Sequence, residues 1–177
     1  YYLPGEKAGG PVQSIAGLVE ALHDEFDFRI VTLDRDLGES VPYENVSPDL
    51  WTRHEGVAVR YLSPRGAAPL ELMRLLRASD CDLLYLNGVF SRRFSMLPVF
   101  LLRLGLIPTV PLLVATRGEL SAGALALRPR RKRMFLRLAN AFGFYRDVHW
   151  LASTALEADE IRAAFPRAGR IGVAMDF

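Results

Sequence analysis

Short apolar runs alternate with amphipathic stretches along most of this 177-residue chain. The apolar runs are largely unbroken by polar residues, which is typical of parallel strands buried on both faces. They predict six strands, and residues 1–3 read as the tail of an earlier one. The six predicted strands are residues 28–32, 57–62, 82–86, 112–116, 150–153 and 170–173.

Between these runs, apolar residues recur at the three- and four-residue spacing of helices. Gly9-Gly10-Pro11 opens the first helix, because proline is favoured at the first helical position. Thr154 and Glu157 form a capping-box pattern that opens the last helix. The predicted helices cover about residues 12–22, 69–76, 91–104, 129–142 and 154–165. In the fourth, we expect Met134, Phe135, Leu138 and Phe142 to be buried.

Strands that alternate with helices predict an α/β fold, a Rossmann-like doubly wound parallel sheet with helices on both faces. We expect residues 1–177 to form a single domain of this kind, with a long loop over residues 34–56. In such a sheet, ligands bind at the carboxyl ends of the strands. Candidate site residues are therefore those that directly follow a predicted strand.

Composition narrows the class of protein. Half of the residues are apolar and 24% are charged, as in soluble globular proteins, and a net charge of +2 argues against nucleic-acid binding. A lone cysteine, Cys81, cannot form an intrachain disulfide, which favours a reducing compartment. No signal-peptide pattern is visible. The apolar stretch 94–116 contains Arg103, Gly105 and three prolines, a pattern unlike a spanning helix.

Gly9 and Gly10 lie between the first predicted strand and the first helix. Glycines there let a phosphate approach the backbone N–H groups of the helix start, and a tight turn is the simpler interpretation. The sequence has no G-x-G-x-x-G fingerprint, no P-loop and no Tyr-x-x-x-Lys pair. These absences argue against another class of nucleotide-using Rossmann enzyme.

Two further predicted strands end in polar residues. Asn87-Gly88 follows strand 82–86, where the amide could bind a sugar hydroxyl or the pair could form a plain loop. Arg117 and Glu119 follow strand 112–116. Arg117 could bind phosphate or carboxylate and Glu119 could accept bonds from hydroxyls, while a surface ion pair is the alternative.

Basic residues cluster at the start of the fourth helix, and such a run usually forms a solvated helix face. There are two functional interpretations of this cluster. It could bind an anionic acceptor such as a lipid diphosphate, or it could contact the anionic face of a membrane. The cluster comprises Arg128, Arg130, Arg131, Lys132, Arg133 and Arg137. His23, His54 and His149 show no metal-ligand spacing.

Taken together, the motifs resemble the amino-terminal domain of glycosyltransferase family 4, whose members have the GT-B fold. The resemblance covers the whole chain and rests on the order of several weak motifs. They are Tyr2-Leu3-Pro4-Gly5 with Gly9-Gly10-Pro11, Leu84-Tyr85-Leu86-Asn87-Gly88, Thr116-Arg117-Gly118-Glu119-Leu120-Ser121, Ala152-Ser153-Thr154-x-x-Glu157, and Ile171-Gly172-Val173-Ala174-Met175-Asp176.

The resemblance implies a retaining transfer of sugar from a nucleotide-sugar donor to a hydroxyl acceptor in cell-surface polysaccharide or lipid-linked glycan synthesis. It implies no metal, no cofactor beyond the donor substrate, and no nucleic-acid partner. It places the enzyme in a bacterial cytoplasm, at the inner face of the membrane if the basic cluster contacts lipid. A second, carboxyl-terminal donor-binding domain would complete the cleft, so residues 1–177 alone should be inactive.

The resemblance also implies roles for individual residues. Gly9 and Gly10 would bind the donor phosphate, while Lys7, Asn87, Gly88, Arg131 and Lys132 would bind the acceptor. Arg117 and Glu119 would be catalytic. Many relatives carry histidine where this chain has Arg117, and a guanidinium stays protonated, so Arg117 would stabilise charge rather than act as a base. The alternative function is a non-catalytic ligand-binding or scaffolding domain.

Overall fold

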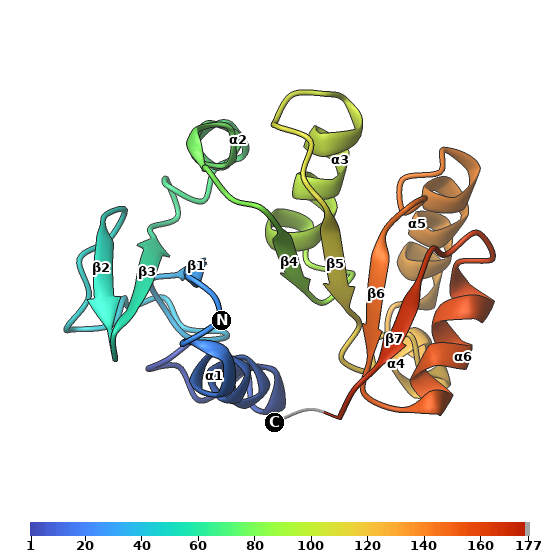
Figure 1. The fold of residues 1–177 in the computed structure, drawn as a ribbon, viewed down its shortest axis with the longest axis horizontal. Coiled ribbons are helices and arrows are strands. Elements are labelled where there is room, and N and C mark those ends of the chain that lie inside the picture. The colour runs from blue at the N-terminus through green and yellow to red at the C-terminus, as the bar shows by residue number, and fades with distance from the viewer. Residues whose placement is uncertain (176–177) are drawn as a thin grey trace. The chain divides into compact units, whose positions relative to one another are not determined.

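The computed structural model describes residues 1–175, which form a mixed series of helices and strands (Figure 1). Residues 1–72 and residues 73–175 form two compact units, here called the amino-terminal unit and the carboxyl-terminal unit. Helix α2 (Pro69–Ala78) spans the boundary between them in the sequence. Each unit has its own sheet and its own buried cluster.

The amino-terminal unit pairs helix α1 (Gly10–Leu22) with a three-stranded sheet in the order β1-β3-β2. Its strands are β1 (Arg29–Leu33), β2 (Trp51–His54) and β3 (Val57–Leu62). Strands β1 and β3 run parallel, and β2 runs antiparallel to β3. Val59 and Tyr61 are buried with Tyr2, and Ile15 and Ala16 of α1 pack against them.

Two sequence predictions were wrong in this unit. Strand β2 lies inside the segment 34–56 that was expected to be a loop; its side chains are only half-buried or exposed, so its apolar signal is weak. Glu55 and Gly56, both with positive φ, make the tight turn into β3. Residues 1–3 are not a strand. The Tyr2 carbonyl accepts a hydrogen bond from the Gly5 N–H at 3.0 Å, which closes a turn instead.

The carboxyl-terminal unit contains a four-stranded sheet in the order β4-β5-β6-β7, and all its strands are parallel. The strands are β4 (Leu84–Asn87), β5 (Leu112–Ala115), β6 (His149–Ala152) and β7 (Ile171–Val173). The predicted parallel sheet with flanking helices is confirmed here, and the arrangement is compatible with a Rossmann-like fold.

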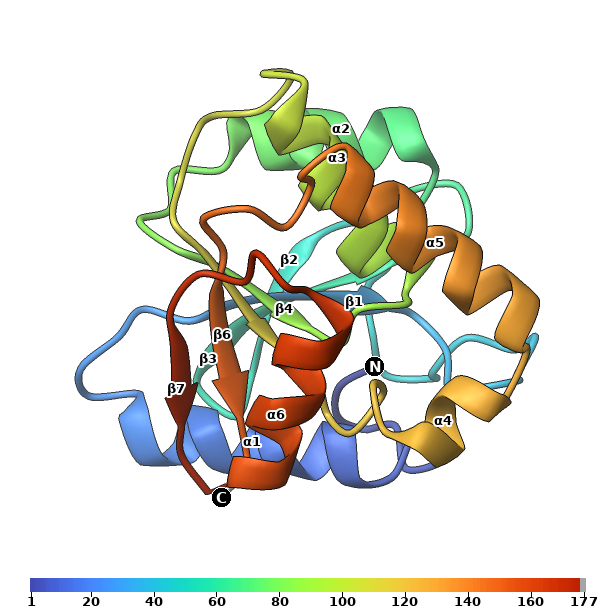
Figure 2. The ribbon, with the colours of Figure 1, turned by 90° about the vertical axis from the view of Figure 1, so that its right-hand side faces the viewer.

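Alternate residues of these strands enter one buried cluster. Leu86, Val114 and Trp150 contact the helices through this cluster, which includes Val99 and Ile161. Figure 2 shows α5 and α6 in front of the strands. The helical elements are the π-helix η1 (Arg92–Met96), α3 (Leu97–Arg103), α4 (Ala122–Ala126), α5 (Pro129–Ala141) and α6 (Ala155–Ala164).

The expected burial of α5 was largely wrong. Met134, Leu138 and Phe142 are exposed, and only Phe135 packs against the buried cluster. Successive helical residues are 100° apart, so a helix that turns Phe135 and Ala139 inward carries Met134 and Leu138 outward. Among residues 1–175, no helix is both long enough and apolar enough to cross a bilayer.

Candidate functional site

The carboxyl ends of three neighbouring strands meet at one edge of the parallel sheet. Asn87 of β4 pairs with Ala115 of β5, and Ala115 in turn pairs with Leu151 of β6. The loops that leave these ends therefore start side by side. They contain the polar residues that the sequence analysis selected after β4 and β5.

Arg117 is the central charge at this edge. Its Nε donates to Oδ1 of Asn87 at 2.7 Å, and its Nη2 donates to the hydroxyl of Tyr85 at 2.8 Å. Tyr85 and Asn87 are two residues apart on β4 and share one face of the sheet, opposite Leu84 and Leu86 of the buried cluster. The guanidinium thus lies against the polar face of β4, where these two bonds help to orient it.

The backbone of Arg117 adopts an uncommon conformation. Its φ is 51°, in the left-handed region, which costs a non-glycine residue of order 1–3 kcal/mol. The next residue, Gly118, has a φ of 69° and occupies this region at little cost. Such strain persists only where surrounding bonds hold it, and it is found preferentially at functional sites.

Glu157 supplies those bonds. Its carboxylate, 5% exposed at the start of α6, accepts hydrogen bonds from the Thr116 hydroxyl and, at 2.7 Å, from the Gly118 N–H. Its second oxygen accepts the N–H and the hydroxyl of Ser153, both at 2.7 Å. One carboxylate thereby fixes the residues on both sides of Arg117 and joins the loops after β5 and β6.

These bonds outweigh the effect of burial on the pKa of Glu157. Desolvation alone would raise this pKa, but the bonds from Thr116, Gly118 and Ser153 together lower it below the ordinary value. The predicted capping box is confirmed in one half, because Thr154 Oγ1 accepts the Glu157 N–H at 3.1 Å. The carboxylate of Glu157 instead accepts bonds from the loops after β5 and β6, a role that the capping pattern did not indicate.

Glu119 holds the loop after β4. Its Oε2 accepts the N–H of Val89, and also the N–H of Phe90 at 3.1 Å. Gly88 has a φ of 109°, and a Cβ at that position would lie 3.2 Å from the same oxygen. The loop after β4 therefore lies against the Glu119 carboxylate. This contact positions Gly88 and the neighbouring Asn87, which accepts the bond from Arg117.

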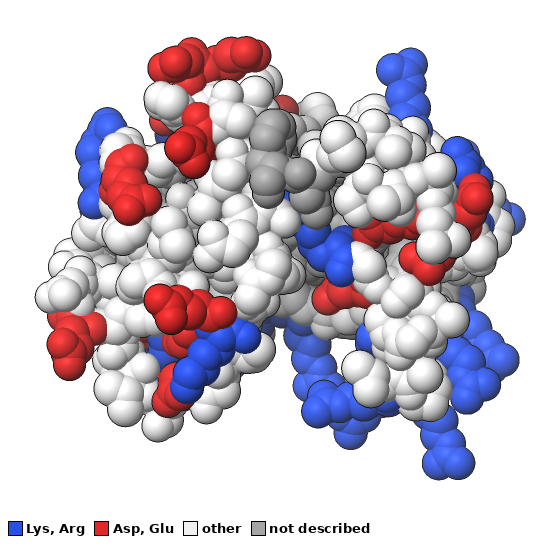
Figure 3. All heavy atoms as spheres, turned by 90° about the horizontal axis from the view of Figure 1, so that it is seen from below, with Lys and Arg blue, Asp and Glu red and all other residues white. Residues whose placement is uncertain are grey.

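The basic residues of α5 divide into two groups. Lys132 is half-buried: its Nζ donates to the Ala124 carbonyl at 2.8 Å and lies 4.5 Å from the centre of the Phe90 ring. Arg131 is exposed, like Arg130 and the other arginines of this helix. Figure 3 shows Lys and Arg side chains projecting into solvent in this part of the molecule. Lys132 is therefore engaged in contacts within the protein, whereas the Arg131 side chain is accessible to a ligand.

The remaining predicted site residues lie in the amino-terminal unit. Lys7 forms an ion pair with Glu39, and both side chains are exposed. Asp36 holds the loop before α1 by two hydrogen bonds. Its Oδ2 accepts the N–H of Glu6 at 2.8 Å and that of Lys7 at 3.0 Å. Desolvation raises the pKa of Asp36, but these backbone bonds and a third from Leu37 lower it on balance.

Gly9 and Gly10 leave the start of α1 open. Gly9 has a φ of 63°, and a Cβ built on either glycine would have no atom within 4 Å beyond its own chain neighbours and helix backbone. Both residues are exposed, and α1 has no acidic residue in its first turn. The helix start can therefore be approached closely by an anion.

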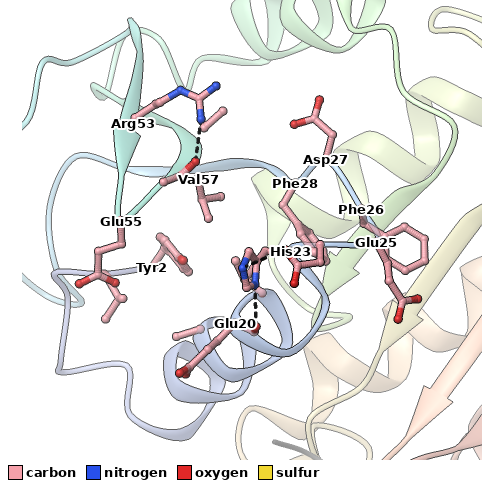
Figure 4. A pocket seen from close by; sticks show the side chains of 16 residues that line it. Tyr2, Glu20, His23, Glu25, Phe26, Asp27, Phe28, Arg53, Glu55 and Val57 are labelled. Atoms are coloured by element: carbon pink, nitrogen blue, oxygen red, sulfur yellow. Dashed lines mark hydrogen bonds and ion pairs between the residues drawn. The ribbon is translucent and has the colours of Figure 1, made fainter.

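A pocket of about 660 Å³ lies in the amino-terminal unit, between the end of α1 and the turn into β3 (Figure 4). No predicted site residue lines it. Its wall carries five carboxylates and one arginine, a balance unsuited to a phosphate ligand. The carboxylates are those of Glu20, Asp24, Glu25, Asp27 and Glu55.

Comparison with known proteins adds no relative. No protein-family model, no curated protein and no solved structure matches the chain. Among residues 1–175, no three His, Cys, Asp or Glu side chains are grouped as metal ligands.

The structure brings Asn87, Gly88, Arg117 and Glu119 together at one sheet edge and adds Glu157. Lys7, Gly9 and Gly10 belong to the other unit, so their participation in the same site remains a prediction, as does that of Arg131. Asp176 of the last motif lies outside the described residues. Tyr85 was missed as a ligand of Arg117, although its position two residues before Asn87 on a strand places it on the same face.

Proposed function

We propose that this chain provides the acceptor-side half of a retaining glycosyltransferase of the GT-B type. The donor would be a nucleotide sugar and the acceptor a hydroxyl of a glycan or lipid-linked glycan, as the family resemblance implies. A carboxyl-terminal domain would bind the nucleotide. Transfer would break the bond between the anomeric carbon and the diphosphate oxygen and form a new bond to the acceptor oxygen, whose proton passes to the leaving diphosphate.

The observation that carries this proposal is the oriented guanidinium of Arg117. It donates hydrogen bonds to Asn87 and Tyr85 and is fixed on a strained backbone at the carboxyl edge of a parallel sheet. Such a cation suits a diphosphate leaving group, because it stabilises negative charge without reorganising during the reaction. In the amino-terminal unit, Gly9 and Gly10 are proposed to bind donor phosphate, because they leave the start of α1 open to an anion.

The two carboxylates of this edge would have different roles. Glu157 would act as a positioning residue, since its oxygens are occupied by Thr116, Gly118 and Ser153. Glu119 would hold the β4 loop with Oε2, and its other oxygen would accept a hydrogen bond from the hydroxyl of the acceptor substrate. Asn87, Gly88, Lys7, Arg131 and Lys132 are proposed to line the acceptor side, with the acceptor presented at the cytoplasmic face of a membrane.

One observation favours the alternative, a non-catalytic ligand-binding domain. Both carboxylates at this edge are engaged by loop N–H groups, so neither is poised as a base. Binding of an anion by Arg117 requires no base, and the same geometry would serve it.

A turnover assay separates the two functions. The full-length protein is incubated with a panel of nucleotide sugars and glycan or lipid-linked acceptors, and release of nucleoside diphosphate is measured together with glycosylated product. We expect one donor to give product with retained anomeric configuration, and Arg117→Met to lower kcat/KM by at least about a hundredfold. Saturable binding of a nucleotide sugar without turnover would instead support the ligand-binding domain.

A further inference from the structure

Helix α5 carries an apolar stripe on its outer face. Met134, Leu138 and Phe142 follow one another at four-residue intervals and are 60%, 48% and 70% exposed. The inner face of the helix is well anchored, with Phe135 and Ala139 in the buried cluster and Asn140 Nδ2 bonded to the Ala164 carbonyl at 2.8 Å. The exposed stripe is thus the outward side of a docked helix, where polar residues are expected.

Further exposed apolar side chains lie at both ends of α5. Leu127, just before the helix, is 69% exposed. At the other end, the rings of Phe142 and Phe144 stack at 5.6 Å, and Phe144 in turn contacts the half-exposed Phe100 of α3. The stripe and the two phenylalanines form a continuous apolar surface of the kind that marks an interaction site, and Leu127 adds an exposed apolar side chain at the start of the helix.

The segment that carries α5 is strongly basic. Residues 120–146 contain six arginines, one lysine and no acidic residue, whereas the whole chain has a net charge of only +2. The rest of the chain is therefore net acidic. The exposed arginines beside the stripe include Arg130 and Arg137, which lie three or four residues from Met134. Their guanidinium groups suit phosphate oxygens, with which they form paired hydrogen bonds.

We propose that the outer face of α5, with Leu127 and Phe100, docks onto the surface of an anionic phospholipid bilayer. The apolar stripe would enter the boundary between headgroups and acyl chains, and the flanking arginines would bind lipid phosphates. Charge complementarity identifies this occupant: an apolar stripe alone would suit another protein, but a stripe flanked by exposed arginines matches a continuous anionic surface. The inference rests on the membrane-facing part of the proposed function but uses no residue of the Arg117 site, so vesicle binding and sugar transfer can fail separately.

Sedimentation with vesicles tests the inference. The protein is mixed with vesicles of phosphatidylcholine alone, or of equal parts phosphatidylcholine and phosphatidylglycerol, at low and high salt. We expect strong binding only to the anionic vesicles, weakened by salt because the charges are screened. Arg130→Gln with Arg137→Gln should lower the partition coefficient about fivefold per arginine. Met134→Ser with Leu138→Ser should lower it about tenfold at unchanged charge.

The matched control combines Leu156→Ser with Arg167→Gln. Both residues are exposed and lie outside the surface, so this variant should bind as the natural protein does. Equal binding of all variants would overturn the proposal, as would failure of the natural protein to bind anionic vesicles at low salt. Sedimentation velocity checks for a rival occupant: a dimer that Met134→Ser with Leu138→Ser dissociates would show a self-association face and also overturn it.

Discussion

Gly118 donates its backbone N–H to the buried carboxylate of Glu157 over 2.7 Å, although 39 positions separate the two residues in the sequence. The Thr116 hydroxyl donates to the same oxygen. Arg117 is therefore held between two residues that a single carboxylate fixes. We regard Glu157 as the residue that maintains the strained conformation of Arg117.

Replacement of Glu157 by glutamine should destabilise the protein. Glutamine keeps one acceptor oxygen but turns an NH₂ group toward backbone and hydroxyl donors, leaving buried groups unpaired. We expect the free energy of unfolding at neutral pH to fall by roughly 2–4 kcal/mol, measured by urea denaturation. Asp159→Asn, on the exposed side of the same helix, should change it little.

The same pair of proteins should differ in pH dependence. Because the pKa of Glu157 is lowered on folding, its contribution is complete above the ordinary value of 4.5 and is lost as pH falls through the lower folded-state pKa. The stability difference between the natural protein and Glu157→Gln should thus be constant above about pH 5 and shrink in acid. A difference that grows on acidification would contradict the assigned direction.

Gly88→Ala should damage the β4 loop. The methyl group would require a φ near 109° in an L-residue and would meet the Glu119 carboxylate at 3.2–3.3 Å. We expect a loss of roughly 2–3 kcal/mol in the free energy of unfolding. Gly105→Ala is the control: its φ is also positive, at 67°, but no atom lies within 4 Å of the new Cβ. An equal loss in both variants would show that the contact with Glu119 contributes nothing.

Asp36→Asn should loosen the loop before α1. Its charged oxygen accepts the N–H groups of Glu6 and Lys7, and charge-assisted bonds are about twice as strong as neutral ones. Faster hydrogen exchange at these two amides is the expected outcome. Glu39→Gln, which alters only the Lys7 side-chain ion pair, should leave the exchange unchanged. Unaltered exchange in Asp36→Asn would mean that the loop is held by other contacts.

The sequence predicted the buried strands well, because runs such as Leu112–Ala115 are apolar throughout and the amphipathic helices have clear starts. Strand β2 escaped prediction, since an edge strand with half-exposed side chains has no strong apolar signal. The mistaken burial of Met134, Leu138 and Phe142 has another cause. Pattern analysis assumes that apolar residues face the core, and this helix carries them on both sides.

The candidate site was predictable in part. Position after a strand was enough to select Asn87, Arg117 and Glu119, because parallel strands end at a common edge. What each side chain bonds to could not be read from position: Glu119 binds the loop N–H groups, and Arg117 binds Tyr85. Glu157 was recognised only as a helix cap, since its long-range bonds depend on the start of α6 lying next to the loop after β5.

Binding of a nucleoside diphosphate tests the role of Arg117 most directly. Calorimetric titration of the full-length protein with uridine, guanosine and adenosine diphosphates should identify one ligand. Its Kd should rise at least about tenfold in Arg117→Met, through loss of the charge-assisted bonds, and less in Arg117→Lys. The unfolding midpoint of Arg117→Lys and the Kd of Arg167→Met should both match the natural protein. An unchanged Kd in Arg117→Met would contradict the account.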